Sequence, residues 1–309
     1  MTGIALLLSC LSAAPAAGQV RDYPILDVHV HAHRTPPPRA YCALSGRIGV
    51  TDEDGRPLCG APLEPARDGP DLMARTLAYL DRYDMYAVAM TQDFSQLESW
   101  MRASGRVLPS IQTGVTDFED NDVRALVEAG SVIAIGEVMS QYEGISPASE
   151  ELDQIWELAV ANDVPVGIHM SAPGAQLPGY VAGFGNPILL EPVLERYPQL
   201  RLYLMHAGWP FLEETVSILR QYPHVYVDIS FIDWQMPRSL FYEYVEGLVL
   251  YGFGKRIMFG TDQNWPDAIE VAIRGIEDAP FLSDAQKRDI FLDNALRFFR
   301  LSEASLRGR

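Results

Sequence analysis

Eight short apolar runs, each separated from the next by an amphipathic stretch, constrain the fold of this chain most strongly. The runs are almost continuously hydrophobic, as parallel strands are when helices cover both faces of a sheet. We expect strands at residues 25–31, 87–91, 107–114, 132–138, 166–170, 201–206, 225–229 and 256–260. We expect helices at 72–83, 96–103, 120–129, 149–162, 187–196, 211–221, 239–251, 266–277 and 283–301. Eight such repeats are typical of a (β/α)₈ TIM barrel with an extra C-terminal helix.

An open, doubly wound sheet is the alternative fold. The sequence contains neither GxGxxG nor GxxxxGK[ST], so no glycine-rich phosphate loop supports that alternative. A length of 309 residues with 48% hydrophobic content suits one large barrel domain, which we place at residues 19–309. The connection at 32–70 is rich in Pro, Gly, Arg and Asp. It follows the first strand and is interpreted as a lid over the pocket, with a disordered excursion as the alternative.

The first eighteen residues carry no charged side chain, and residues 4–11 form a short apolar run. We interpret residues 1–18 as a signal peptide that directs export to the periplasm or the medium, against the alternative of a cytoplasmic protein. Cys42 and Cys59 lie in the same Pro- and Gly-rich loop. In an exported protein they could form a disulfide, but two unrelated thiols explain the sequence equally well.

Polar residues stand at or just beyond the carboxyl ends of five expected strands. In a parallel barrel these ends open at one mouth, so the side chains should converge there. Neutral imidazoles and carboxylates together suit Zn²⁺, Mn²⁺ or Fe²⁺. The candidate residues are His29, His31, Glu137, His169, His206 and Asp262.

The motifs around these residues resemble the metal-dependent amidohydrolase superfamily, in its amidohydrolase-related (amidohydrolase 2) branch. They are "DVHVH", "GIHM", "MHAGW", "FGTDQNW" and a C-terminal "DNALRFF". The resemblance implies that His29, His31, His169 and Asp262 bind a metal ion. Glu137 takes the place where many two-metal relatives carry a carboxylated lysine. A glutamate in this place resembles the TatD-like and related subgroups, where it contacts the metal. The number of metal ions, one or two, therefore stays open. If there are two, His169 and His206 would hold the second ion. If there is one, His206 would act as a general acid or base or would polarise a carbonyl group.

The predicted function is metal-dependent hydrolysis of a C–N or C–O bond in an amide, lactone or ester, with Asp262 moving the proton. A single-metal decarboxylase, a TatD-like nuclease and a non-catalytic metal-binding protein are the alternatives. The net charge of -17 disfavours nucleic acid and anionic membranes. We expect a small-molecule substrate and no stable membrane insertion, and a homo-oligomer remains open.

Other residues are assigned around this centre. Asp27 is expected to support a ligand histidine, or else to be an ordinary buried polar residue. His33 and His224 are interpreted as structural. Arg34 and Arg39 are the basic groups expected nearest to the mouth. The expected rim of the pocket comprises Gln92, Tyr142, Trp209, Asp233, Trp234, Gln235, Asn264 and Trp265.

Overall fold

The computed structural model describes residues 21–46, 52, 56–120, 122–171 and 178–308. The predicted signal peptide and part of the 32–70 loop lie outside the described residues. Within the described ranges, no helix is both long and apolar enough to cross a membrane.

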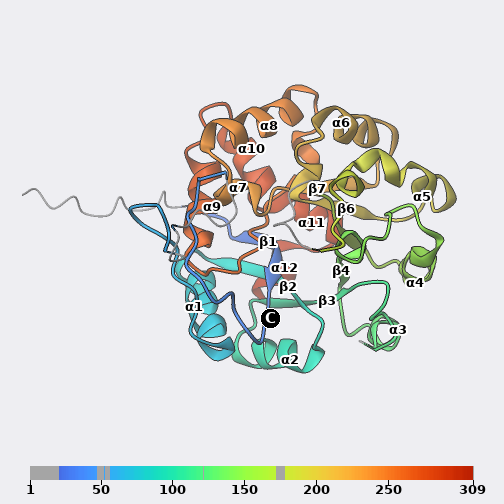
Figure 1. Ribbon diagram of the computed structural model, residues 1–309, viewed down its shortest axis with the longest axis horizontal. Coiled ribbons are helices and arrows are strands. Elements are labelled where there is room, and N and C mark those ends of the chain that lie inside the picture. Colours follow the sequence, from blue (N-terminus) through green and yellow to red (C-terminus); the bar gives the residue numbers. More distant parts are fainter. Residues whose placement is uncertain (1–20, 47–51, 53–55, 121, 172–177, 309) are drawn as a thin grey trace, which may run out of the picture.

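Eight parallel strands form one sheet in sequence order, which confirms the predicted (β/α)₈ barrel (Figure 1). The last strand has two residues, fewer than predicted, yet the chain beyond it nearly closes the barrel against the first strand. There Val28 N–H donates to Phe259 O at 3.0 Å, and Asp262 N–H donates to His29 O at 2.7 Å. The strands are β1 Ile25–His31, β2 Met85–Thr91, β3 Val107–Thr113, β4 Ala134–Val138, β5 Val166–His169, β6 Leu202–Met205, β7 Val225–Asp228 and β8 Ile257–Met258.

Helices surround the strands (Figure 1). They are α1 Gly69–Arg82, α2 Phe94–Ala103, α3 Val123–Glu128, α4 Asp153–Asn162, α5 Glu191–Arg196, α6 Leu212–Gln221, α7 Ile232–Gln235, α8 Arg238–Leu250, α9 Ala268–Glu277, α10 Asp284–Arg288, α11 Asn294–Phe299 and α12 Glu303–Arg307. Short turns of helix are η1 Ser140–Glu143, η2 Glu150–Leu152, η3 Ala182–Gly185, η4 Pro187–Leu190, η5 His206–Gly208, η6 Gly254–Arg256 and the π-helical η7 Asp289–Asp293. The short α7 and α12 were not predicted. The predicted C-terminal helix is present as α10, η7 and α11, with Ser283 as its N-cap.

Two apolar layers hold the barrel together. Along β6, Leu202 and Leu204 pack toward the helices, whereas Tyr203 and Met205 belong to the inner layer. Phe298 of α11 belongs to the same inner layer. Because alternate residues of a strand point to opposite faces, continuously apolar strands are needed to fill both layers.

Irregularities in two strands help to aim the polar residues at the mouth. Between Asp27 and Val30, β1 has one residue more than its partner β2. β4 likewise has one extra residue, between Ile135 and Val138, relative to both of its neighbours. A bulge of this kind changes which face the following side chains occupy and is frequent next to active sites. The two bulges include His29 and Glu137.

A glycine in β5 gives a stability prediction. A Cβ atom on Gly167 would lie 2.4 Å from Cζ of the buried Tyr203, whereas a Cβ on Gly183 would meet nothing within 4 Å. We expect Gly167→Ala to lower the free energy of unfolding by about 1–3 kcal/mol, because overpacking displaces buried groups. Gly183→Ala should change it little. Denaturant unfolding of both variants tests this, and equal stabilities would contradict the packing described.

The described parts of the 32–70 loop are attached to the mouth side of the barrel. A disulfide joins Cys42 to Cys59, which resolves the alternatives left open by the sequence. Tyr41 pairs with Leu63 through two backbone hydrogen bonds of 2.9 and 2.7 Å. The ring of Tyr41 also packs against Trp265, with centroids 4.7 Å apart. The described loop therefore lies against the segment that follows β8.

Candidate metal centre

The six predicted site residues lie together at the carboxyl ends of the strands. His29 and His31 come from β1, Glu137 from β4 and His169 from the end of β5; His206 directly follows β6, and Asp262 lies beyond β8. The four histidines and Glu137 are at most 4% exposed. The side chain of Asp262 is 13% exposed, which makes it the most accessible of the six. Their roles as ligands and catalysts remain predictions.

The first half-site consists of His29, His31, Asp262 and Oε2 of Glu137. Nε2 of His29 lies 3.2 Å from Nε2 of His31. Oδ1 of Asp262 lies 2.9 Å from Nε2 of His31 and 3.7 Å from Nε2 of His29. Oε2 of Glu137 is 3.6 Å and 3.9 Å from the same two nitrogens. Four donor atoms therefore face one small volume.

The second half-site consists of His169, His206 and Oε1 of Glu137. Oε1 lies 2.5 Å from Nδ1 of His169 and 3.5 Å from Nε2 of His206. The two ring nitrogens are 3.0 Å apart. Each half-site offers at least three donors within 4.8 Å of one another. Glu137 thus contributes one oxygen to each half-site.

The electrostatics of the centre favour a bound cation. Three carboxylates, Glu137, Asp228 and Asp262, contact the histidines. Burial alone would raise the pKa of Glu137, but the neighbouring imidazoles, His169 first, hold it well below its ordinary value. Burial would also lower the pKa of His29, but the carboxylates, Asp228 foremost, outweigh it and raise the pKa to about 10. Buried carboxylates need positive partners, and a proton or a metal ion can fill that role.

The hydrogen bonds of His169 test whether these residues fit a metal. Tyr180 donates its hydroxyl proton to the carbonyl oxygen of Ser171 at 2.7 Å, so the same hydroxyl, 3.1 Å from Nε2 of His169, must accept there. Burial lowers the pKa of His169, which favours the neutral ring. Nδ1 of His169 is therefore a lone pair facing the Glu137 carboxylate. Two acceptors this close need a shared positive charge, which a proton or a bound divalent ion can supply, so the residues fit a divalent ion.

The backbone at the mouth is strained where it presents side chains to the site. His206, Phe231 and Asp262 have positive φ angles of 62°, 66° and 48°. Non-glycine residues rarely adopt this conformation, and functional sites are where such strain is commonly retained. The ring of Phe231 contacts that of His206, with centroids 5.9 Å apart.

The sequence analysis missed Asp228 and Ser230. Asp228 ends β7, and its Oδ2 lies 3.2 Å from Nδ1 of His29. In β7, Val225 and Val227 pack toward the helices. Because alternate residues of a strand point to opposite faces, this pattern could have indicated that the Asp228 carboxylate points into the barrel. Asp27, predicted to support a ligand histidine or else to be an ordinary buried polar residue, accepts the backbone N–H of His29 at 3.0 Å.

Two further rings lie against the site histidines. His33 follows β1, as expected for a loop residue, but its ring stacks on His31 with centroids 4.6 Å apart. Burial and then His31 lower the pKa of His33 to about 4, so it stays neutral. Tyr142, from the predicted rim, packs on His169 at 4.7 Å and is 38% exposed. His224 is exposed before β7, as predicted.

The predicted rim is only partly correct. Asp233, Trp234 and Gln235 are at most 1% exposed and lie within the wall rather than on its surface. They belong to the unpredicted helix α7, whose short turn carries them inward. Asn264 does contact the centre, since its Nδ2 lies 3.3 Å from Oδ1 of Asp262.

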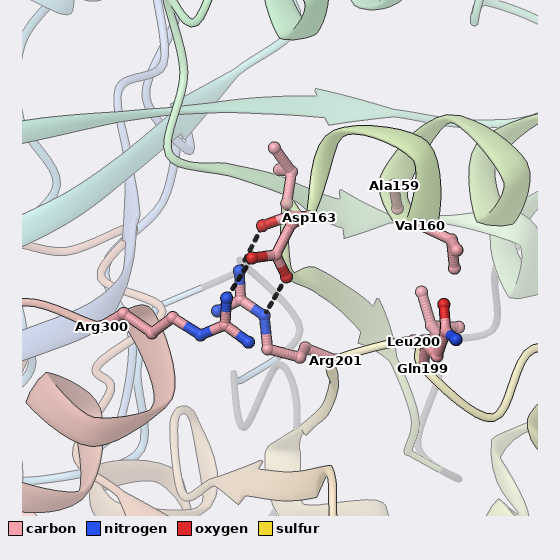
Figure 2. Close-up of a pocket in the computed structure, with 8 residues that line it drawn as sticks. Ala159, Val160, Asp163, Gln199, Leu200, Arg201 and Arg300 are labelled. Carbon is pink, nitrogen blue, oxygen red and sulfur yellow. Dashed lines mark hydrogen bonds and ion pairs between the residues drawn. The ribbon is translucent and has the colours of Figure 1, made fainter.

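A pocket elsewhere has a different character. Figure 2 shows the acidic side chain of Asp163 between Arg201 and Arg300, at the amino ends of β5 and β6. Nε of Arg201 donates to Asp163 at 3.2 Å, and Nη1 of Arg201 donates to the carbonyl oxygen of Phe298 at 2.7 Å. The carboxylate of Asp163 and the guanidinium groups of Arg201 and Arg300 therefore neutralise one another. Since active sites of such barrels form at the carboxyl ends of the strands, we assign this pocket a structural role.

Fold and site together define a (β/α)₈ barrel with groups of imidazoles and carboxylates at its mouth that could hold divalent ions. A model of the amidohydrolase family matches residues 27–301. The chain belongs to this family, which confirms the resemblance seen in the sequence. No protein of curated function matches the chain significantly.

Solved structures similar to this chain include both hydrolases and decarboxylases. A probable 2-pyrone-4,6-dicarboxylic acid hydrolase from Acinetobacter baumannii has a TM-score of 0.60 at 12% identity, covering 90% of this chain and 99% of that one. The 5-carboxyvanillate decarboxylase from Sphingomonas paucimobilis has a TM-score of 0.56 at 15% identity, with the same coverages. An amidohydrolase from Burkholderia multivorans with bound zinc has a TM-score of 0.58 at 15% identity, again covering 90% and 99%. At sequence identities this low, the similarity to these structures establishes the fold alone.

Proposed function

We propose that this chain is a hydrolase that uses two divalent ions to cleave an amide, lactone or ester bond of a small molecule. The observation that carries the proposal is the position of Glu137. Its two oxygens face different groups of histidines, 3.6 Å from Nε2 of His31 on one side and 2.5 Å from Nδ1 of His169 on the other. One carboxylate placed between two sets of donors suits a bridge between two ions.

The donor set favours zinc. His29, His31 and Asp262 would hold one ion, His169 and His206 the other, and Glu137 both. Four imidazoles with carboxylates are a common zinc environment, although Mn²⁺ and Fe²⁺ accept similar donors. When bound, such ions lower the pKa of a water molecule and polarise a carbonyl group.

Asp262 is the group we assign to proton transfer. Its side chain is the most exposed of the six, so it can meet both water and substrate. Asn264 lies against its Oδ1 at 3.3 Å and orients the carboxylate. Asp262 would accept a proton as the water oxygen bonds to the carbonyl carbon, and then deliver it to the departing nitrogen or oxygen as the C–N or C–O bond breaks.

The charges around the mouth favour a neutral substrate. No lysine or arginine in the described ranges forms a hydrogen bond or ion pair with the six site residues. Arg34, one of the two basic residues expected there, pairs with Asp93 at the surface. A free carboxylate on the substrate would therefore rely on the metal ions, or on Arg39, whose carbonyl oxygen accepts from Trp265 at the rim.

A decarboxylase is the second candidate, because solved neighbours of the same fold include decarboxylases such as the 5-carboxyvanillate enzyme. In that case one ion would hold the substrate, and His206 or Asp262 would move the proton.

We also propose that the protein works outside the cytoplasm. The Cys42–Cys59 disulfide supports this, since disulfides persist in oxidising compartments.

Metal analysis combined with a substrate panel tests the proposal. Protein purified without chelator should carry about two ions per chain, and it should hydrolyse members of a panel of neutral esters, lactones and amides. Removal of the ions should abolish turnover, and reloading with zinc should restore it. One ion with CO₂ release from an aromatic carboxylic acid would favour the decarboxylase. Bound metal without turnover on either panel would favour a metal-binding protein.

A further inference from the structure

Two buried polar residues behind the metal centre, Asp228 and Ser230, have contacts that the proposed reaction does not use. Both are 0% exposed. The hydroxyl oxygen of Ser230 lies 2.9 Å from Nδ1 of His29 and 3.1 Å from Nδ1 of His206. Ser230 thus contacts one histidine from each half-site, on the ring nitrogen that faces away from the centre.

The positions of the protons follow from the acceptors. Oδ1 of Asp228 lies 2.6 Å from Oγ of Ser230 and 3.0 Å from the backbone nitrogens of Ser230 and His206. A carboxylate can only accept, so Ser230 donates its single hydroxyl proton to Asp228. The hydroxyl oxygen of Ser230 must then accept from both rings, and the backbone carbonyl oxygen of Ser230, 3.2 Å from Nδ1 of His206, is a second acceptor for that ring. Nδ1 of His29 and of His206 therefore carry protons, so Nε2 of each ring is the nitrogen left to bind a metal ion at the centre.

The packing leaves this pair little freedom. A Cβ atom on Gly260 would lie 3.1 Å from Cβ of His29, 3.2 Å from Cβ of Ser230 and 3.4 Å from Cγ of Asp228. Only a glycine fits there without displacing a neighbour. A side chain at position 260 would therefore press on His29, Ser230 and Asp228 together.

A role for Asp228 as a metal ligand is the competing explanation. His29, His206 and Asp228 offer one donor each within 4.8 Å of one another. However, the Ser230 hydroxyl already contacts all three residues. Oδ1 of Asp228 also accepts three hydrogen bonds. These contacts favour hydrogen-bonded support over a further ion.

We propose that Asp228 and Ser230 are positioning residues that fix the tautomers of His29 and His206, one histidine in each half-site. The inference rests on the proposed metal-dependent function. Groups that hold the outward nitrogen of a ligand histidine orient the ring and raise its affinity for the metal. Asp228 contacts the His29 ring directly, so the first half-site should depend on it most.

Asp228→Asn is the sharpest test, because it preserves shape. The asparagine oxygen must remain with its three donors, so its NH₂ group faces Nδ1 of His29. This NH₂ group then opposes the proton on Nδ1 of His29, which keeps only the Ser230 hydroxyl as an acceptor. The repulsion displaces the ring or shifts its proton to Nε2, and either change weakens Nε2 as a zinc ligand. We expect the affinity for one of two zinc ions to fall about 10–100-fold while the other is unchanged. Competition with a chromophoric chelator, on metal-free protein titrated with zinc, measures both affinities.

Two further variants keep the test decisive. Ser230→Ala removes only the hydroxyl group and should lower the affinity for both zinc ions by a smaller factor. If Asp228→Asn does not fold, the zinc affinities of Ser230→Ala test the inference instead. Asp289→Asn is the matched control, because Asp289 is a buried carboxylate that pairs with Lys255 away from the centre. It should bind zinc as the wild-type protein does.

The outcomes separate this inference from the proposed function. Two zinc ions bound by the wild-type protein, with unchanged affinities in both Asp228→Asn and Ser230→Ala, would overturn the inference alone. A third zinc ion that Asp228→Asn loses would also overturn it, because Asp228 would then be a ligand. Wild-type protein that binds no zinc would overturn the proposed function and this inference with it.

Discussion

His169→Ala is expected to lose zinc from the second half-site and to lose more than about 100-fold in kcat/KM, which exceeds the usual effect of removing a group that only supports a ligand. His169 supplies the lone pair that lies 2.5 Å from Oε1 of Glu137. Without it, the Glu137 carboxylate keeps one imidazole partner in that half-site. Metal content and steady-state kinetics on the same preparations measure the two losses.

His224→Ala is the control for this variant. His224 is exposed before β7, away from the mouth, so its replacement should leave both metal content and kinetics unchanged. Full zinc occupancy in folded His169→Ala would show that His169 is not a ligand.

Asp262→Asn is expected to lower kcat by about 10²–10⁴-fold, the usual contribution of a general acid–base group, while most of the metal is retained. Asparagine keeps an oxygen for the first half-site but cannot accept and return a proton. Burial would raise the pKa of Asp262, but His29 and then His31 hold it below its ordinary value, so the wild-type group is ionised at neutral pH. Measurement of both kcat and zinc content of the variant separates the role of Asp262 in proton transfer from its role as a metal ligand.

Asn264→Ala provides the comparison. It removes an amide that contacts Asp262 but leaves the carboxylate in place. Its kcat should fall far less than that of Asp262→Asn. A kcat for Asp262→Asn within a few fold of the wild-type value would exclude Asp262 as the proton carrier.

The barrel and the meeting of the six residues could be predicted because both follow from local patterns. Continuously apolar strands indicate a sheet covered on both faces, and the ends of parallel strands must share one side. His169 and Asp262 could be placed together for this reason, although 93 positions separate them in the sequence.

Other features depend on contacts that a local pattern does not carry. The bulge at His29 is visible only as a shift in register against β2. The contact between Ser230 and two histidine rings comes from a residue beyond β7, where strand alternation no longer applies. Trp234 is buried because helix α7 directs its side chain into the wall of the barrel. This helix is too short to produce a helical period in the sequence.

Anomalous diffraction at the zinc absorption edge, from crystals of the zinc-loaded protein, tests the central claim most directly. The structure predicts two peaks on opposite sides of the Glu137 carboxylate, one beside His29 and His31 and the other beside His169 and His206. A single peak, or zinc bound away from Glu137, would contradict the two-ion centre.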